Sequence, residues 1–107
     1  MTAHDWVVGV KKYVANADDS VIKGIVRHCG SALQSADGSF VACNDKSERD
    51  RIRDGFLKKK LALSDSDAEL DKAVTAVCER MKADRDKSRV TLYYLLAKKY
   101  GKLAMFA

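Results

Sequence analysis

The sequence has no proline, six glycines and three cysteines among its 107 residues. Average usage would give about five prolines in a chain of this length, so their absence argues against proline-rich linkers and many tight turns. Three cysteines are too few for a disulfide-dense mini-protein, and no stretch approaches the roughly 18 apolar residues that a membrane span needs. The remaining composition, 47% hydrophobic and 33% charged, predicts one soluble globular domain over residues 1–107.

The N-terminal residues and the cysteines indicate the compartment. No basic region precedes a long apolar run at the N-terminus, so the sequence does not predict a signal peptide. Cys29, Cys43 and Cys78 are odd in number and form no C-x-x-C pair. We therefore expect reduced thiols in a cytoplasmic protein. Cys29 and Cys78 fall on apolar helical stripes, where a free cysteine packs as a small hydrophobic residue.

Apolar residues recur at helical spacing in five segments, at about residues 3–15, 19–33, 46–60, 67–83 and 88–100. The segment 67–83 has the clearest single apolar face. In the segment 88–100 the apolar side chains fill an arc of about 200°, which predicts a central helix packed from several sides. The sequence therefore predicts an all-α fold, a single compact domain of about five helices.

Start and stop signals support these boundaries. Asp18 or Asp19 can cap the second helix, and the pairs Asp45–Glu48 and Ser66–Glu69 have the spacing of capping boxes. Gly101 is a typical helix stop. Residues 35–45 contain the turn signal Asp37-Gly38 and predict a non-helical loop, from which Phe40 or Val41 enters the core. We expect Met105 or Phe106 of the apolar tail to dock on the core or on a neighbouring subunit.

The formal net charge of +5 is unevenly distributed along the chain. From Arg80 onward there are eight basic and two acidic residues, a net charge of +6, while the first 79 residues carry a net charge of −1. This basic quarter can be a solvated surface that keeps the protein soluble, or it can attract phosphates and acidic partners. The residues predicted to contact a partner or nucleic acid are Arg85, Lys87, Arg89, Lys98, Lys99 and Lys102.

The sequence predicts neither a catalytic site nor a cofactor. Catalysis by a Ser-His or Cys-His pair would have to use His4 or His28, and His28 beside an apolar stripe is typical of a structural residue. The phosphate-binding glycine loops are absent. One weak metal site remains: after removal of Met1, the N-terminal amine, two amides and the His4 imidazole can surround Cu(II) or Ni(II) in a square plane.

Four segments together carry a family resemblance. They are Phe56-Leu57-x-Lys59-Lys60-Leu61-x-Leu63, Glu69-Leu70-Asp71-x-Ala73-Val74, Asp86-Lys87-Ser88-Arg89 and Val90-x-x-Tyr93-Tyr94-Leu95-Leu96-x-Lys98-Lys99-x-Gly101-Lys102. In this order and spacing the chain resembles the short bacterial proteins grouped as domain of unknown function 2853. The resemblance implies an all-helical single domain and no established activity. The chain departs from the family pattern in the loop that follows Gly30, which lacks the usual proline and tyrosine.

We therefore expect a small soluble bacterial protein that acts as a protein-interaction or homo-oligomerising module without catalytic activity. The small size and the enrichment of Tyr, Phe, Met and Arg in residues 89–107 favour a protein partner or a homodimer through the last helix and the tail. The alternative is weak nucleic-acid binding through the basic quarter, residues 80–102. No membrane contact is expected.

Overall fold

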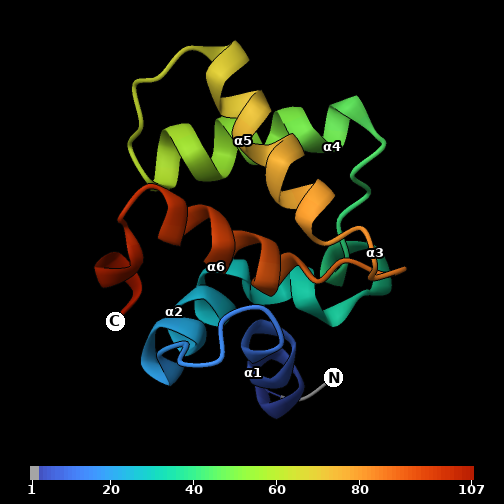
Figure 1. Ribbon diagram of the computed structural model, residues 1–107, viewed down its shortest axis with the longest axis vertical. Helices are drawn as coiled ribbons and strands as arrows, with labels where there is room; N and C mark the ends of the chain where they lie inside the picture. Colours follow the sequence, from blue (N-terminus) through green and yellow to red (C-terminus); the bar gives the residue numbers. More distant parts are fainter. Residues whose placement is uncertain (1–2) are drawn as a thin grey trace.

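Helix α6 (Arg89–Lys99) runs through the middle of the molecule and organises the fold (Figure 1). The computed structural model describes residues 3–107. Helices α1 (Ala3–Lys11) and α2 (Asp19–Cys29) pack on one side of α6, and α5 (Asp67–Arg80) packs on the other. The radius of gyration of 12.5 Å is close to the roughly 13 Å expected of one compact domain of this size. The described chain is thus a single all-α globule, as the sequence predicts.

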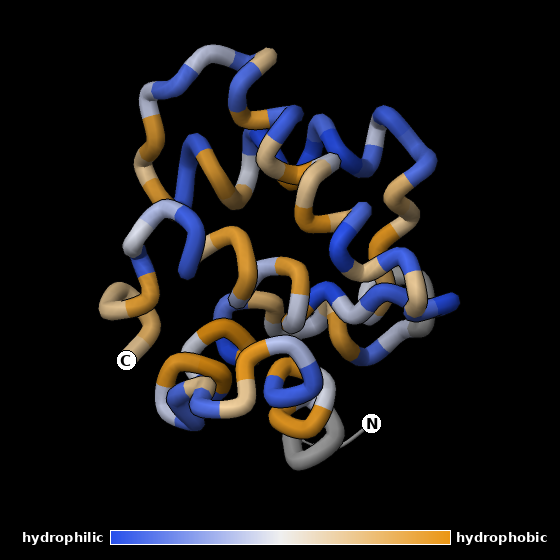
Figure 2. The backbone as a smooth tube through the Cα atoms, in the orientation of Figure 1, coloured by the Kyte–Doolittle hydropathy of each residue, from blue (hydrophilic) through white to orange (hydrophobic). Residues whose placement is uncertain are grey.

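The burial of α6 explains its wide apolar arc. Every residue from Val90 to Ala97 is buried, including the hydroxyl-bearing Thr91, Tyr93 and Tyr94. Hydrophobic residues also occur along the surrounding helices (Figure 2), and the buried ones form one core cluster with those of α6. A helix covered on all sides depends on packing, because it has no solvated face. Within residues 3–107, no helix is long and apolar enough to cross a membrane.

Helices α2, α4 and α5 start at predicted capping residues, and α6 starts at Ser88. The carboxylates of Asp18 and Asp45 accept hydrogen bonds from Ser20 N at 2.8 Å and Ser47 N at 2.9 Å. The hydroxyls of Ser66 and Ser88 accept from the amides at the third helical positions of α5 and α6. These bonds satisfy amide groups that have no partner inside the helix, and each is worth about 1 kcal/mol.

The second predicted helix ends four residues early. Gly30 has φ of +53°, a conformation that stops α2 at Cys29 and starts the 3₁₀ turn η1 (Gly30–Gln34). The short helix α3 (Ala36–Ser39) follows, so the predicted non-helical loop at 35–45 is wrong over its first third. Residues 40–45 have no helix, and Val41 from this part is buried in the core, as predicted.

The predicted helix at 46–60 has two parts. Helix α4 (Lys46–Arg51) continues directly into η2 (Ile52–Lys60), a π-helical segment closed by a hydrogen bond from Leu61 N to Phe56 O at 2.9 Å. The wider turn still places Ile52, Phe56 and Leu57 in the core, as expected from the sequence.

The C-terminal tail docks on the core. It forms the 3₁₀ turn η3 (Leu103–Phe106), in which Phe106 is buried and its ring stacks on Phe56 at 6.1 Å between centroids. The tail crosses α2 at Gly24, where an added Cβ would lie only 1.9 Å from the Phe106 carbonyl oxygen. The prediction that the tail docks is confirmed for Phe106, whereas Met105 remains 45% exposed.

Candidate functional site

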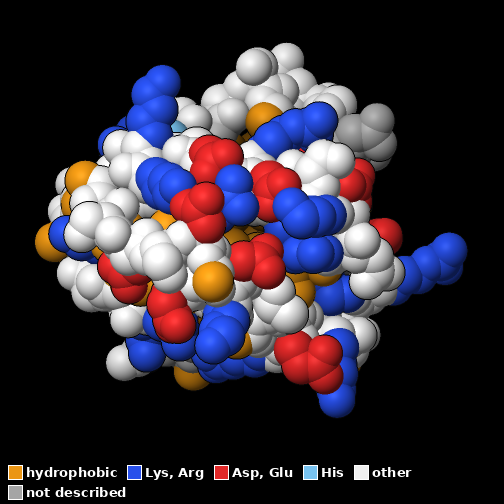
Figure 3. Space-filling model, turned by 90° about the horizontal axis from the view of Figure 1, so that it is seen from above, with side chains coloured by type: hydrophobic (Ala, Val, Ile, Leu, Met, Phe, Trp, Pro, Cys, Tyr) orange, Lys and Arg blue, Asp and Glu red, His pale blue; other side chains and the backbone are white. Residues whose placement is uncertain are grey.

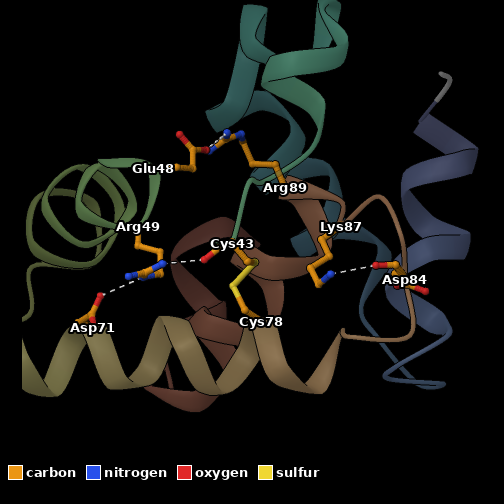
Figure 4. Close-up of a disulfide and its surroundings, with 8 residues drawn as sticks. All are labelled: Cys43, Glu48, Arg49, Asp71, Cys78, Asp84, Lys87 and Arg89. Carbon is orange, nitrogen blue, oxygen red and sulfur yellow. Dashed lines mark hydrogen bonds and ion pairs between the residues drawn. A yellow bond between two sulfur atoms is a disulfide. The ribbon is translucent and has the colours of Figure 1, made fainter. Parts of the chain in front are cut away.

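A disulfide between Cys43 and Cys78 joins the segment after α3 to helix α5 (Figure 4). The two Cα atoms are 6.0 Å apart although 35 positions separate the residues in sequence. The prediction of reduced thiols is therefore wrong for these two cysteines, because the 40–45 segment folds back onto α5. Cys29 is the free cysteine among the described residues, and burial raises the pKa of its thiol to about 11.

Other contacts hold the 40–45 segment in place independently of the disulfide. Val41 N donates to Lys87 O at 2.8 Å, next to a single β-bridge between Phe40 and Ser88. Arg49 Nη1 donates to Cys43 O at 2.8 Å, and Arg49 Nε lies 3.5 Å from a carboxylate oxygen of Asp71 on α5. The backbone beside the disulfide is thus fixed from α4, from α5 and from the segment before α6.

Arg89 lies in the interior of this region. Its guanidinium donates to Gly38 O at 2.6 Å and to Tyr93 Oη at 3.0 Å, and it forms an ion pair with Glu48. The two side chains of that pair are only 13% and 12% exposed. Burial lowers the pKa of Arg89, but the attraction of Tyr93 and Glu48 outweighs it and the net pKa is raised. Arg89 therefore stays charged and joins α3, α4 and α6. The prediction that Arg89 contacts a partner or nucleic acid is wrong, because its side chain is only 13% exposed and its guanidinium is already bonded.

Two adjoining cavities of about 540 and 700 Å³ flank the 40–45 segment. The first, which we call the disulfide groove, is lined by both cysteines together with parts of the 41–45 segment, of α5 and of the 82–87 segment. Cys43 is partly exposed there, and Cys78 is 6% exposed. Three cations, Lys82, Arg85 and Lys87, and two acids, Asp45 and Glu79, line the groove.

Asp84 connects the segment before α6 to the end of α1. Its carboxylate pairs with Lys12 and accepts a hydrogen bond from Tyr13 Oη at 2.6 Å, and its carbonyl accepts from Lys87 Nζ at 3.0 Å. The hydrogen bond from Lys12, followed by the one from Tyr13, holds the pKa of Asp84 below its usual value. Burial and the bond to Asp84 raise the pKa of Tyr13 to about 12.

The Tyr13–Asp84 contact predicts a pH dependence. The folded pKa of Tyr13 lies near 12, above the ordinary value of about 10, so its stabilising contribution is complete below about pH 10 and is lost as the pH rises toward 12. Replacing Asp84 by asparagine should lower the Tyr13 pKa part of the way toward 10. Ultraviolet titration of tyrosinate, with Tyr13→Phe to assign the signal, measures the change. Asp86→Asn is the control, and an unchanged Tyr13 pKa in Asp84→Asn contradicts the assignment.

A third cavity, of about 280 Å³, lies between α5 and α6, and we call it the basic groove. Its residues are Ala76, Val77, Arg80, Leu95, Lys98 and Lys99. Val77 and Leu95 form an apolar floor, and all three charged groups at the rim are cations. Arg80 is oriented by a hydrogen bond from Nη2 to Tyr13 O at 3.1 Å. Among the side chains that the structure describes, no acid lies within 4 Å of Lys98 or Lys99.

The cations predicted to contact a partner do not share one surface. Arg85 and Lys87 line the disulfide groove, whereas Lys98 and Lys99 line the basic groove. Lys102 is partly exposed beyond the end of α6. Seen from above, Lys and Arg side chains are interspersed with Asp and Glu side chains on the visible face (Figure 3). The charge of the C-terminal quarter is therefore divided among separate features.

Of the two histidines, the structure describes the side chain of His28. The Thr2-Ala3-His4 site predicted for Cu(II) or Ni(II) lies outside the described residues, which exclude Met1, Thr2 and the His4 side chain. His28 packs against the rings of Phe56 and Phe106 at 5.7 and 6.2 Å, and burial, with a smaller effect of Lys60, lowers its pKa. Within the part of the chain that the structure describes, no group of three or more His, Cys, Asp or Glu side chains is placed to hold a metal ion.

Comparison with known proteins identifies a family and no activity. No match is found among curated proteins. The family model described as "Protein of unknown function (DUF2853)" matches residues 5–104, nearly the whole chain. The match agrees with the resemblance carried by the Tyr93-Tyr94-Leu95-Leu96 segment and its trailing lysines. The chain therefore belongs to the DUF2853 family of proteins of unknown function.

Proposed function

We propose that this protein is an interaction module that binds an acidic segment of a partner protein in the basic groove between α5 and α6. One observation carries the proposal: Arg80, Lys98 and Lys99 surround an apolar floor, and no acid lines the same cavity. Opposite charges across an interface guide association and select partners. A partner segment with carboxylates on either side of one apolar side chain would match both the rim and the floor.

The aromatic side chains favour a peptide over a nucleic acid. Binding of single strands relies on exposed aromatic rings on which bases stack, together with a basic surface. Tyr93 and Tyr94 are 8% and 2% exposed, so neither offers a ring face to a base. The groove is also bounded on one side, because Lys99 borders a neighbouring hollow that contains Asp65 and Glu69. These acids would repel a phosphate backbone that continued past Lys99.

The same features argue against a second copy of the chain as the occupant. Nearly all of α6 is buried within the monomer, and Phe106 of the tail is already packed on its own core. Two basic grooves facing each other would bring six cations together, which costs free energy unless acids separate them. Light scattering at high concentration should therefore find a monomer, and a concentration-dependent dimer that Lys98→Gln abolishes would contradict the assignment.

Fluorescence anisotropy of a labelled peptide tests the proposal. The probe has one leucine flanked on each side by two acidic residues and is titrated at about 50 mM salt. The double variant Lys98→Gln/Lys99→Gln should bind about 3- to 10-fold more weakly, since each surface charge is worth about 0.2–1 kcal/mol. Added salt should weaken binding to the wild type more than binding to this variant.

The matched control removes the same net charge elsewhere. Lys23 and Lys59 are exposed and line neither groove, so Lys23→Gln/Lys59→Gln should bind like the wild type. Equal losses in both double variants would show that only net charge matters and would overturn the proposal. A labelled single-stranded RNA is the second probe. RNA binding that is tighter than peptide binding and is lost in Lys98→Gln/Lys99→Gln would replace the proposed partner with a nucleic acid.

A further inference from the structure

We infer that the disulfide groove is a site of thiol–disulfide exchange, where a small thiol bearing carboxylates, of the chemical class of glutathione, reduces the Cys43–Cys78 bond. The inference does not depend on the basic groove or on the proposed partner. It rests on three features of the groove: access to the sulfur atoms, unequal exposure of the two cysteines and cations beside them.

The cavity brings a thiol to the disulfide. Its volume of about 540 Å³ lies within the range of small-molecule pockets, about 300–1,000 Å³. Both cysteines line it, and Cys43 is partly exposed, so a thiol would approach the bond between them through this cavity. Exchange rates depend on such access to the attacked sulfur atom.

The different exposures of the two cysteines indicate which sulfur atom an incoming thiolate attacks. Cys43 is partly exposed, whereas Cys78 on α5 is 6% exposed. An incoming thiolate therefore bonds to Cys43 Sγ, the Cys43–Cys78 bond breaks, and its electron pair leaves on Cys78 Sγ, which takes a proton from water. A second thiolate attacks the small-molecule sulfur of this mixed disulfide and releases Cys43 as a thiolate. The protein disulfide is reduced by two electrons, and two thiols are oxidised to their own disulfide.

The charged groups around the cavity favour an anionic thiol. Glu79 is paired with Lys82 at 3.4 Å, and Asp45 accepts hydrogen bonds from Ser47 at the start of α4. Lys87, which lines the groove, donates from Nζ to Asp84 O at 3.0 Å. Arg85 is exposed, and no described acid lies within 4 Å of it. A guanidinium binds a carboxylate through two parallel hydrogen bonds, so we expect Arg85 to bind a carboxylate of the incoming thiol compound.

The groove should survive the reaction. Val41 N, Arg49 Nη1 and Arg89 Nε all hold the 38–43 backbone through hydrogen bonds that do not involve sulfur. Opening the disulfide therefore leaves the segment beside α5, with Cys43 close to Cys78. This placement makes the exchange reversible.

The experiment compares two thiols on three proteins. Glutathione carries a net negative charge, and 2-mercaptoethanol is neutral; the rate of disulfide opening is measured with each. In Arg85→Gln/Lys87→Gln the rate with glutathione should fall about 3- to 10-fold, while the rate with 2-mercaptoethanol changes less than about 2-fold. Lys98→Gln/Lys99→Gln, which loses the same charge at the basic groove, should match the wild type with both thiols.

Quenching the reaction and mapping the peptides identifies the attacked sulfur. The mixed disulfide with glutathione should be found on Cys43. The neutral thiol also reports on folding, because a loosened variant would react faster with both reagents. Equal rate changes with both thiols in Arg85→Gln/Lys87→Gln, or a mixed disulfide found mainly on Cys78, would overturn the inference.

Discussion

Replacing Arg89 by methionine should lower the free energy of unfolding by about 3–5 kcal/mol, the usual cost of breaking a buried ion pair from one side. The variant leaves Glu48, whose side chain is 12% exposed, without its buried partner and with only the exposed Arg51 beside it. It also removes the donors to Gly38 O and Tyr93 Oη. Chemical denaturation of the wild type and the variant measures the loss directly.

A double variant separates the charge from the packing. In Arg89→Met/Glu48→Met neither charge is buried, so part of the lost stability should return. Arg51→Met is the matched control: it also pairs with Glu48, at 3.5 Å, but its side chain is 76% exposed. Its cost should stay below about 1 kcal/mol. A similar small cost for Arg89→Met would contradict the role given to the buried pair.

Loss of the disulfide should cost about 3–4 kcal/mol, because the 35-residue separation of Cys43 and Cys78 sets the chain entropy that the bond removes from the unfolded state. In a domain of this size that loss corresponds to a fall in Tm of about 15 °C. Thermal unfolding of Cys43→Ala/Cys78→Ala, and of the wild type with excess reductant, measures the effect.

Cys29 provides the control for this measurement. It is partly buried and forms no disulfide, so Cys29→Ala should leave the effect of the reductant unchanged. The reduced wild type should remain folded, since typical stabilities of about 5–15 kcal/mol exceed the expected loss. If the reductant opens the disulfide and leaves Tm unchanged, the bond contributes nothing to stability and the expected loss of about 3–4 kcal/mol is wrong.

Much of the fold could be predicted from the sequence because its signals are local. Asp18, Asp45 and Ser66 cap helices through bonds to residues two or three positions away. The wide apolar arc of residues 88–100 predicts the central position of α6, because a helix without a polar face must be covered on every side. The early end of α2 depends on the positive φ of Gly30. The sequence did not predict it, because the apolar pattern of residues 19–33 continues past this glycine.

The features around the disulfide depend on contacts between residues distant in sequence. Three cysteines at wide spacing do not indicate which two form a disulfide. The Cα atoms of Cys43 and Cys78 come within 6.0 Å only through the fold. Arg89 was grouped with the surface cations because Glu48, its partner, lies 41 positions away. The glutamate was expected to complete a capping box with Asp45 and instead pairs with Arg89. The distribution of charge along the sequence predicts a basic C-terminal quarter. It does not predict that the cations of this quarter lie in two separate grooves and in the interior.

We propose that an acidic peptide segment binds in the groove between α5 and α6. Amide chemical shifts measured during a peptide titration test this binding most directly. The account predicts that the shifts concentrate at the groove residues, Ala76, Val77, Arg80, Leu95, Lys98 and Lys99. The same titration reports on Arg85 and Lys87 at the disulfide groove. Shifts confined to those two residues and their neighbours, or no shifts at millimolar peptide, would contradict the claim.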